Sequence, residues 1–158
     1  MSFRVAIVGA GPAGLYAGIL LKNCKPEATV QVYERNPVDA TFGFGVVFSD
    51  QALAFLAKDD PDTAQLFESR MESWTDISVA HRDTQISIDG IGFSSIGRLD
   101  LLTLLRERAQ ELGVDITYNY EVESVEALGK ADLVIGADGI NSVVRAQSPN
   151  SFGESASH

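Results

Sequence analysis

The sequence predicts an α/β fold in which a parallel sheet carries a small antiparallel insertion. Three observations lead to it: an apolar run from Phe3 to Val8 opens into a glycine-rich turn, strand-like and helix-like segments then alternate, and between Trp74 and Ile88 the hydrophobic period changes to two. Alternating strands and helices favour right-handed crossovers on a parallel sheet. At 158 residues with 45% hydrophobic content, the chain is expected to form one domain.

The glycine-rich turn reads Gly9-Ala10-Gly11-Pro12-Ala13-Gly14, a GxGxxG pattern between a predicted strand and a predicted helix. In such a unit the first glycine makes the turn, the second lets backbone approach a pyrophosphate, and the third lets the helix pack on the strand. Pro12 falls in the first helical turn, where its missing N–H costs nothing and the free N–H groups point at an anion.

The next apolar run, Val30 to Tyr33, ends at Glu34, 20 residues beyond Gly14. A carboxylate at this position accepts hydrogen bonds from an adenosine ribose and disfavours a 2′-phosphate. The sequence therefore predicts a Rossmann-like dinucleotide site that takes FAD or NAD rather than NADP.

The apolar stretch from Val5 to Leu21 has a second interpretation, as an export signal or a membrane span. It contains four glycines and a proline, has one basic residue before it, and lacks the charged flank and cleavage pattern of a signal. It is also at the short edge of the roughly 17–25 residues that cross a bilayer. We therefore expect a soluble, cytoplasmic chain with no membrane partner.

The net charge of −10, from 22 acidic and 12 basic residues, argues against nucleic acid or an anionic membrane as a partner, because either needs a basic face. Cys24 is the only cysteine, so a disulfide framework is impossible. With only two histidines beside it, a Cys/His metal site is not expected either. Cys24 itself is expected to be a small buried residue at the end of the first helix.

The remaining elements follow from periodicity and from capping residues. Strands of the parallel sheet are expected at Arg4–Val8, at Thr29–Tyr33, around Ile116 and at Leu133–Gly136, with the last of these buried. A further short strand is expected at Val122–Val125, and a hairpin pairs Ile77–Val79 with Ile86–Ile88. Helices are expected over Pro12–Cys24, from Ser49 or Asp50 to Lys58, from Asp60-Pro61 to about Met71, and from Arg98 to Gly113.

Two segments resist this assignment. Glycines interrupt the aromatic run from Phe42 to Phe48, which is too irregular for a helix and too rich in glycine for a stable strand. Such a segment is a candidate for backbone lying close to a planar ligand, and a core loop is the alternative. After Arg145 the apolar pattern ends, so residues 146–158 are expected to form a disordered tail.

Three separated stretches share one pattern: the GxGxxG unit ending in Glu34, the helix start Arg98–Leu102, and Ala131–Gly139 followed by Asn141-Ser142 and Arg145. Together they resemble the class A FAD-dependent aromatic hydroxylases, the p-hydroxybenzoate hydroxylase type. The third stretch looks like the Asp-Gly motif that these enzymes use near flavin and NAD(P)H. The resemblance covers about residues 4 to 145. Within the family, the chain looks most like the salicylyl-CoA 5-hydroxylase and 2-aminobenzoyl-CoA monooxygenase branch, and secondarily like the violacein-pathway tryptophan hydroxylase.

The resemblance implies that residues 1–145 are an incomplete glutathione-reductase-type FAD domain, with residues 74–97 as part of a substrate-side β region. Arg98 would reach the flavin's phosphate or ribityl region, and Asp138 with Arg145 would order the turn beside the pyrophosphate. A surface arginine and a strand-end turn residue are the alternatives for Arg98 and Asp138. The residues implied to contact FAD are Gly9, Gly11, Pro12, Ala13, Gly14, Glu34, Arg35, Arg98, Val122, Asp138 and Gly139.

The family's chemistry is the hydroxylation of an aromatic ring by O₂ on FAD, with NAD(P)H as the transient reductant. The implied substrate is a small aromatic acid carried as its CoA thioester, with a free aromatic acid or a tryptophan-like compound as the runner-up. No side chain of this sequence stands out as a catalytic acid or base, and His81 is interpreted as structural.

Family members continue into a second flavin motif, Gly-Asp, and into most of the substrate sheet. Neither is found in this sequence, so we expect an incomplete chain, truncated, frameshifted or cut. Two alternatives stay open at this point: the NAD-binding Rossmann module of a dehydrogenase, and an FAD-binding fragment without catalytic activity.

Overall fold

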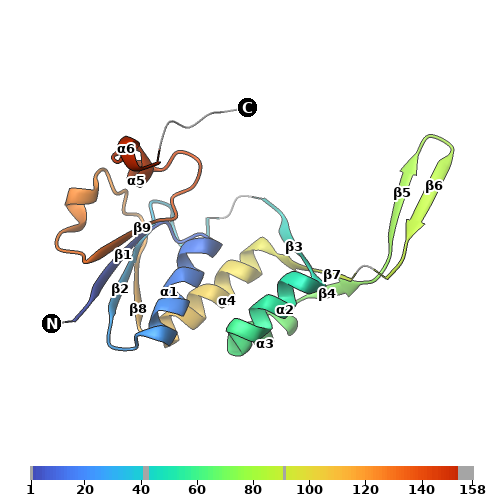
Figure 1. The fold of residues 1–158 in the computed structure, drawn as a ribbon, viewed down its shortest axis with the longest axis horizontal. Coiled ribbons are helices and arrows are strands. Elements are labelled where there is room, and N and C mark those ends of the chain that lie inside the picture. The colour runs from blue at the N-terminus through green and yellow to red at the C-terminus, as the bar shows by residue number, and fades with distance from the viewer. Residues whose placement is uncertain (1, 41–42, 91, 153–158) are drawn as a thin grey trace. The chain divides into compact units, whose positions relative to one another are not determined.

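The computed structural model describes residues 2–40, 43–90 and 92–152 (Figure 1). The chain divides into two compact units, one formed by Met1–Ala40 with Leu105–His158 and the other by Thr41–Leu104. The first unit carries a parallel sheet and the second carries antiparallel sheets.

The sheet of the first unit consists of β1 (Arg4–Val8), β2 (Thr29–Tyr33), β8 (Val114–Thr117) and β9 (Leu133–Gly136). Its order is β8-β2-β1-β9 and every neighbouring pair is parallel. Helix α1 (Pro12–Cys24) connects β1 to β2 and lies against the sheet (Figure 1). This architecture confirms the predicted fold class.

The core of the first unit lies between α1 and the sheet. Ile7 of β1, Val32 of β2 and Ile19 of α1 are each fully buried. A Cβ added at Gly18 would lie 3.5 Å from the Val114 side chain and 3.7 Å from Cδ1 of Ile7, so the helix approaches the sheet closely at this point.

Three expectations for the first unit are wrong. Val122–Val125 is not a strand: without a neighbouring strand to pair with, the chain enters a 3₁₀ turn, η1 (Val125–Leu128), capped by the Ser124 hydroxyl. Strand β9 is a sheet edge rather than a buried strand, and Leu133 is 39% exposed. Cys24, at the last position of α1, is exposed and free.

The second unit contains β3 (Gly45–Ser49), α2 (Asp50–Asp59), α3 (Pro61–Glu68), β4 (Glu72–Trp74), β5 (Ile77–His81), β6 (Thr84–Ile88) and β7 (Phe93–Gly97). An antiparallel sheet has the order β3-β7-β4, and β5 pairs with β6 in the predicted hairpin. Helix α4 (Arg98–Glu111) begins in this unit and continues into the first.

The glycine-rich segment is also different from its expectation. Gly45–Phe48 does form a strand, because β3 pairs with β7 over its whole length. Glycine fits there since a Cβ on Gly45 would lie 2.9 Å from the carbonyl oxygen of Ile96. Phe44 is fully exposed rather than part of a core loop, and Phe42 lies outside the described residues. Helix α3 ends at Glu68, before the expected Met71.

Beyond β9 the described chain forms two short helices, α5 (Val143–Ala146) and α6 (Pro149–Phe152). The division into a domain of residues 1–145 and a tail of residues 146–158 stays a prediction. Among the residues that the structure describes, no helix is both long and apolar enough to cross a bilayer.

Candidate functional site

Gly9 and Gly14 are required by the packing of the chain itself. Gly9 follows β1 with φ +104°, and a Cβ there would lie 2.3 Å from the carbonyl oxygen of Ala137. A Cβ on Gly14 would lie 1.9 Å from the carbonyl oxygen of Gly9. Both distances are far below van der Waals contact, so only glycine lets α1 and the segment after β9 close on this turn.

Gly11 is different from both. Its φ of −70° suits any residue, and a Cβ built on it meets no atom within 4 Å among the described residues. Internal packing therefore gives no reason for glycine at this position. The backbone of Gly11 faces open space, where a ligand could approach it closely.

The amino end of α1 is suited to an anion. Gly11 is its N-cap and provides no side-chain capping bond, Pro12 occupies the first turn, and that turn holds no acidic residue. The first amides of a helix have no partner within the helix, and its dipole places positive charge there. A phosphate group would accept hydrogen bonds from these amides and would be stabilised by the positive end of the dipole.

Glu34 is fixed beside this turn. Its Oε2 accepts a hydrogen bond from the Ala10 amide at 2.8 Å, and its Oε1 accepts from the backbone and side-chain amides of Asn36 at 2.9 and 2.7 Å. An ionised carboxylate has about four acceptor positions, so it keeps room for a further donor. The part played by Asn36 was missed from the sequence, because a loop residue two positions beyond an acid carries no recognisable pattern.

The predicted Asp-Gly motif packs against the glycine turn. The amide of Ala137 donates to the carbonyl oxygen of Val8 at 2.7 Å, and Ala137 is the residue that touches Gly9 and Gly14. Oδ2 of Asp138 accepts from the Val143 amide at 2.6 Å. Two motifs more than 120 residues apart in the sequence thus meet at the carboxyl ends of β1 and β9.

The loop after the motif is ordered by its own side chains. The Arg145 guanidinium donates to the carbonyl oxygen of Ile140, and the Ser142 hydroxyl caps α5 at the Arg145 amide. Gly139 has φ +84°. Oδ1 of Asp138 is buried and has no hydrogen-bond partner in the described part of the chain, which leaves one acceptor for a group that binds there.

Tyrosines that the sequence reasoning missed lie near Glu34. The rings of Tyr33 and Tyr120 have centroids 5.3 Å apart, and the Tyr120 amide donates to the Glu34 carbonyl oxygen. Burial raises the pKa of the Tyr118 hydroxyl, an effect that the neighbouring Arg106 opposes and the Glu34 charge adds to. Tyr118 therefore stays neutral at physiological pH.

The other predicted site residues are placed as follows. Pro12 and Ala13 form the first turn of α1, Arg35 is exposed, and Val122 is buried in a segment without regular structure. Arg98 lies in the second unit at the start of α4, where its amide donates to the Phe44 carbonyl oxygen at 3.1 Å. Its Nε is buried and unpartnered within the described ranges. Contacts of these residues with FAD stay predictions.

No protein-family model matches the chain. Curated proteins do. It is 41% identical to the salicyloyl-CoA 5-hydroxylase of a Streptomyces species, over 97% of this chain and 30% of that enzyme. It is 31% identical to the 3-hydroxy-4-methyl-anthranilyl-[aryl-carrier protein] 5-monooxygenase of Streptosporangium sibiricum, over 95% of this chain and 42% of that enzyme.

Solved structures also match nearly the whole chain. The tetrameric form of 2-methyl-3-hydroxypyridine-5-carboxylic acid oxygenase has a TM-score of 0.80 and 26% identity, over 98% of this chain and 43% of that protein. PqsL of P. aeruginosa, in complex with 2-aminobenzoylacetate, has a TM-score of 0.76 at 18% identity, which shows the shared fold. The chain spans 30% and 42% of the two curated relatives. The relatives and structural neighbours of the chain are thus FAD-dependent aromatic hydroxylases and monooxygenases, of which it matches an amino-terminal part.

Proposed function

We propose that the chain binds the ADP half of FAD at the amino end of α1 and serves as the FAD-binding portion of an NAD(P)H-dependent aromatic monooxygenase. The observation that carries the proposal is Gly11, whose missing side chain leaves open space that the packing of the described residues does not explain. The similarity to aromatic hydroxylases and monooxygenases over nearly the whole chain supports the same function.

The roles follow from the geometry of the first unit. The first-turn amides of α1 bind the pyrophosphate, with the backbone of Gly11 beside it. Glu34 accepts the ribose hydroxyls, and the Ala10 and Asn36 amides hold its carboxylate in place. Asp138 and Gly139 contribute the neighbouring turn. For Arg98, which lies in the second unit, the proposed contact with the flavin's phosphate or ribityl region rests on the family resemblance alone. FAD, when bound, supplies the redox chemistry.

The substrate that we propose for the whole enzyme is a small aromatic acid carried as a thioester. Two relatives support this choice through their names, one referring to a CoA ester and one to an aryl-carrier protein. A free aromatic acid is the second candidate, because the name of another relative is salicylate hydroxylase.

The competing assignment, an NAD-binding module, uses the same glycine turn and acid. The Asp138-Gly139 motif against Gly9 and the similarity to aromatic monooxygenases favour FAD. Titration of the purified chain with FAD and with NAD, followed by flavin fluorescence and by calorimetry, tests the choice. Tight binding of NAD with no binding of FAD would exclude our proposal.

Glu34→Ala is expected to weaken FAD binding by roughly 1.5–3 kcal/mol, the value of charge-assisted hydrogen bonds to the ribose. Because the substitution also removes the bonds to Ala10 and Asn36, Glu34→Gln is the matched control: it keeps the shape and one acceptor oxygen. The dissociation constant of FAD is measured for both variants alongside thermal unfolding. Unchanged affinity in both would show that Glu34 does not contact the ribose.

The purified chain is expected not to hydroxylate. Hydroxylation requires a positioned ring and the exclusion of water, whereas most of the contacts proposed here hold the ADP half of FAD. With NADH or NADPH, FAD and salicyloyl-CoA, we expect peroxide at most and no new hydroxylated product by mass spectrometry. Product formed in stoichiometric coupling to O₂ uptake, without a complementing fragment, would contradict this.

A further inference from the structure

A pocket of about 300 Å³ opens on the face of the parallel sheet that α1 does not cover. Ile7 points toward α1, where Gly18 lies against it. Since side chains alternate along a strand, Arg4 and Ala6 point to the opposite face. In register they pair with Thr29 and Gln31 of β2, and all of these residues line the pocket.

This face is polar where a packed face is expected to be apolar. Strands β1 and β2 are the two inner strands of the sheet, and inner strands of parallel sheets normally read as continuous apolar runs because both faces are covered. Thr29 is nevertheless exposed, and Gln31 is half-buried. The alternation of β2 therefore suits a polar occupant rather than a packed helix.

The pocket is also basic in a strongly acidic chain. Arg4 and Lys130 line it, none of the described residues that line it is acidic, and the chain carries a net charge of −10. Within the ranges that the structure describes, neither cationic side chain forms an ion pair. Two positive charges with no carboxylate partner on one concave surface favour an anion.

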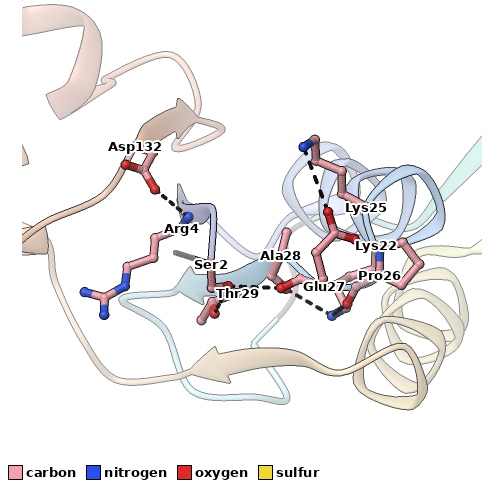
Figure 2. Close-up of polar contacts among 9 residues, drawn as sticks. All are labelled: Ser2, Arg4, Lys22, Lys25, Pro26, Glu27, Ala28, Thr29 and Asp132. Carbon is pink, nitrogen blue, oxygen red and sulfur yellow. Dashed lines mark hydrogen bonds and ion pairs between the residues drawn. The ribbon is translucent and has the colours of Figure 1, made fainter.

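The nearest acid, Asp132, fixes the pocket wall through backbone atoms. Its Oδ2 accepts from the Arg4 amide at 2.8 Å, and its own amide donates to the Arg4 carbonyl oxygen at 2.8 Å. Figure 2 shows the Arg4 guanidinium directed away from this carboxylate. The reciprocal bonds hold the segment that carries Lys130 against the strand that carries Arg4.

We propose that this pocket binds a phosphate monoester. Arg4 and Lys130 match the two negative charges of the phosphoryl group. Leu128 and Ala131 give the rim an apolar surface for the ester group. Arg4 and Thr29 begin β1 and β2, at the end opposite Gly9, and the pocket also extends to Tyr33 at the other end of β2. The phosphate is therefore proposed at the Arg4 end, apart from the proposed FAD site.

The test is calorimetric titration of the chain with phenyl phosphate, with benzoate as the monoanionic comparison. Arg4→Met and Lys130→Met keep an unbranched apolar stem and remove the charge together with its N–H donors, and Arg4→Met leaves the backbone bonds to Asp132 intact. Lys58→Met, in α2 and not among the residues that line the pocket, removes the same charge elsewhere. We expect phenyl phosphate to bind saturably to the unmodified chain. Its affinity is expected to be lower by about tenfold or more in either pocket variant and unchanged in Lys58→Met.

Titration with and without FAD separates this site from the glycine turn. Phosphate affinity that is the same in both conditions supports the pocket, whereas displacement by FAD would assign the phosphate to Gly11 and overturn the proposal. No saturable binding, equal affinity in Arg4→Met, or equally tight benzoate would also overturn it. If FAD itself does not bind, the comparison of Arg4→Met with Lys58→Met still decides the question.

Discussion

Replacement of Gly9 by alanine is expected to lower the free energy of unfolding by about 2–5 kcal/mol, the sum of a left-handed backbone cost and of overpacking. Gly9 has φ +104°, and the new Cβ would lie 2.3 Å from the carbonyl oxygen of Ala137. The obstacle is backbone, which cannot rotate aside as a side chain can. Either the turn or the segment after β9 must shift, and urea denaturation monitored by circular dichroism measures the loss.

Gly129→Ala is the matched control for this prediction. Gly129 has φ +69°, but its Cβ would meet no atom within 4 Å among the described residues. With ψ −146° its backbone is in a region that essentially only glycine adopts, so it carries a backbone cost of about 1–3 kcal/mol without the collision. Equal destabilisation by the two substitutions would show that the contact between Gly9 and Ala137 has no energetic importance.

Replacement of Gly11 by alanine is expected to leave the stability of the chain almost unchanged and to weaken FAD binding. Its φ of −70° and the open space around its Cβ predict a change in unfolding free energy within about 0.5 kcal/mol, as for an ordinary surface substitution. FAD affinity is expected to fall about tenfold or more, because the added methyl group occupies the space through which the pyrophosphate reaches the backbone. A loss of stability equal to that of Gly9→Ala would refute this separation of roles.

The first unit could be predicted from the sequence because its signals are local. Strands β1 and β9 are largely apolar runs, β2 and β8 alternate apolar with polar residues, and Pro12 and Cys24 bound α1 as predicted. The β3-β7-β4 sheet of the second unit was not predicted, because its strands pair with partners far away in the sequence. Strand β3 is stable because Val46 pairs with Ile96, 50 residues away, and no local pattern reveals such a partner.

The candidate site was predictable in its residues but not in its contacts. The spacing of Gly9, Glu34 and Asp138 in the sequence predicts them as site residues. The close approach of Gly9 to Ala137, however, is a tertiary contact that no local pattern predicts. The pairing of Asn36 with Glu34 has no sequence signature either. Leu133–Gly136 was expected to be buried because it is apolar, and strand order alone makes it an edge.

The most direct measurement is a titration of the wild-type chain and of Gly11→Ala with FAD, with NAD as the competing nucleotide and thermal unfolding of both proteins alongside. Our account predicts that the wild-type chain binds FAD, that NAD does not displace it, and that Gly11→Ala binds about tenfold or more weakly at unchanged stability. Equal FAD affinity in two equally stable proteins, or displacement of FAD by NAD, would contradict it.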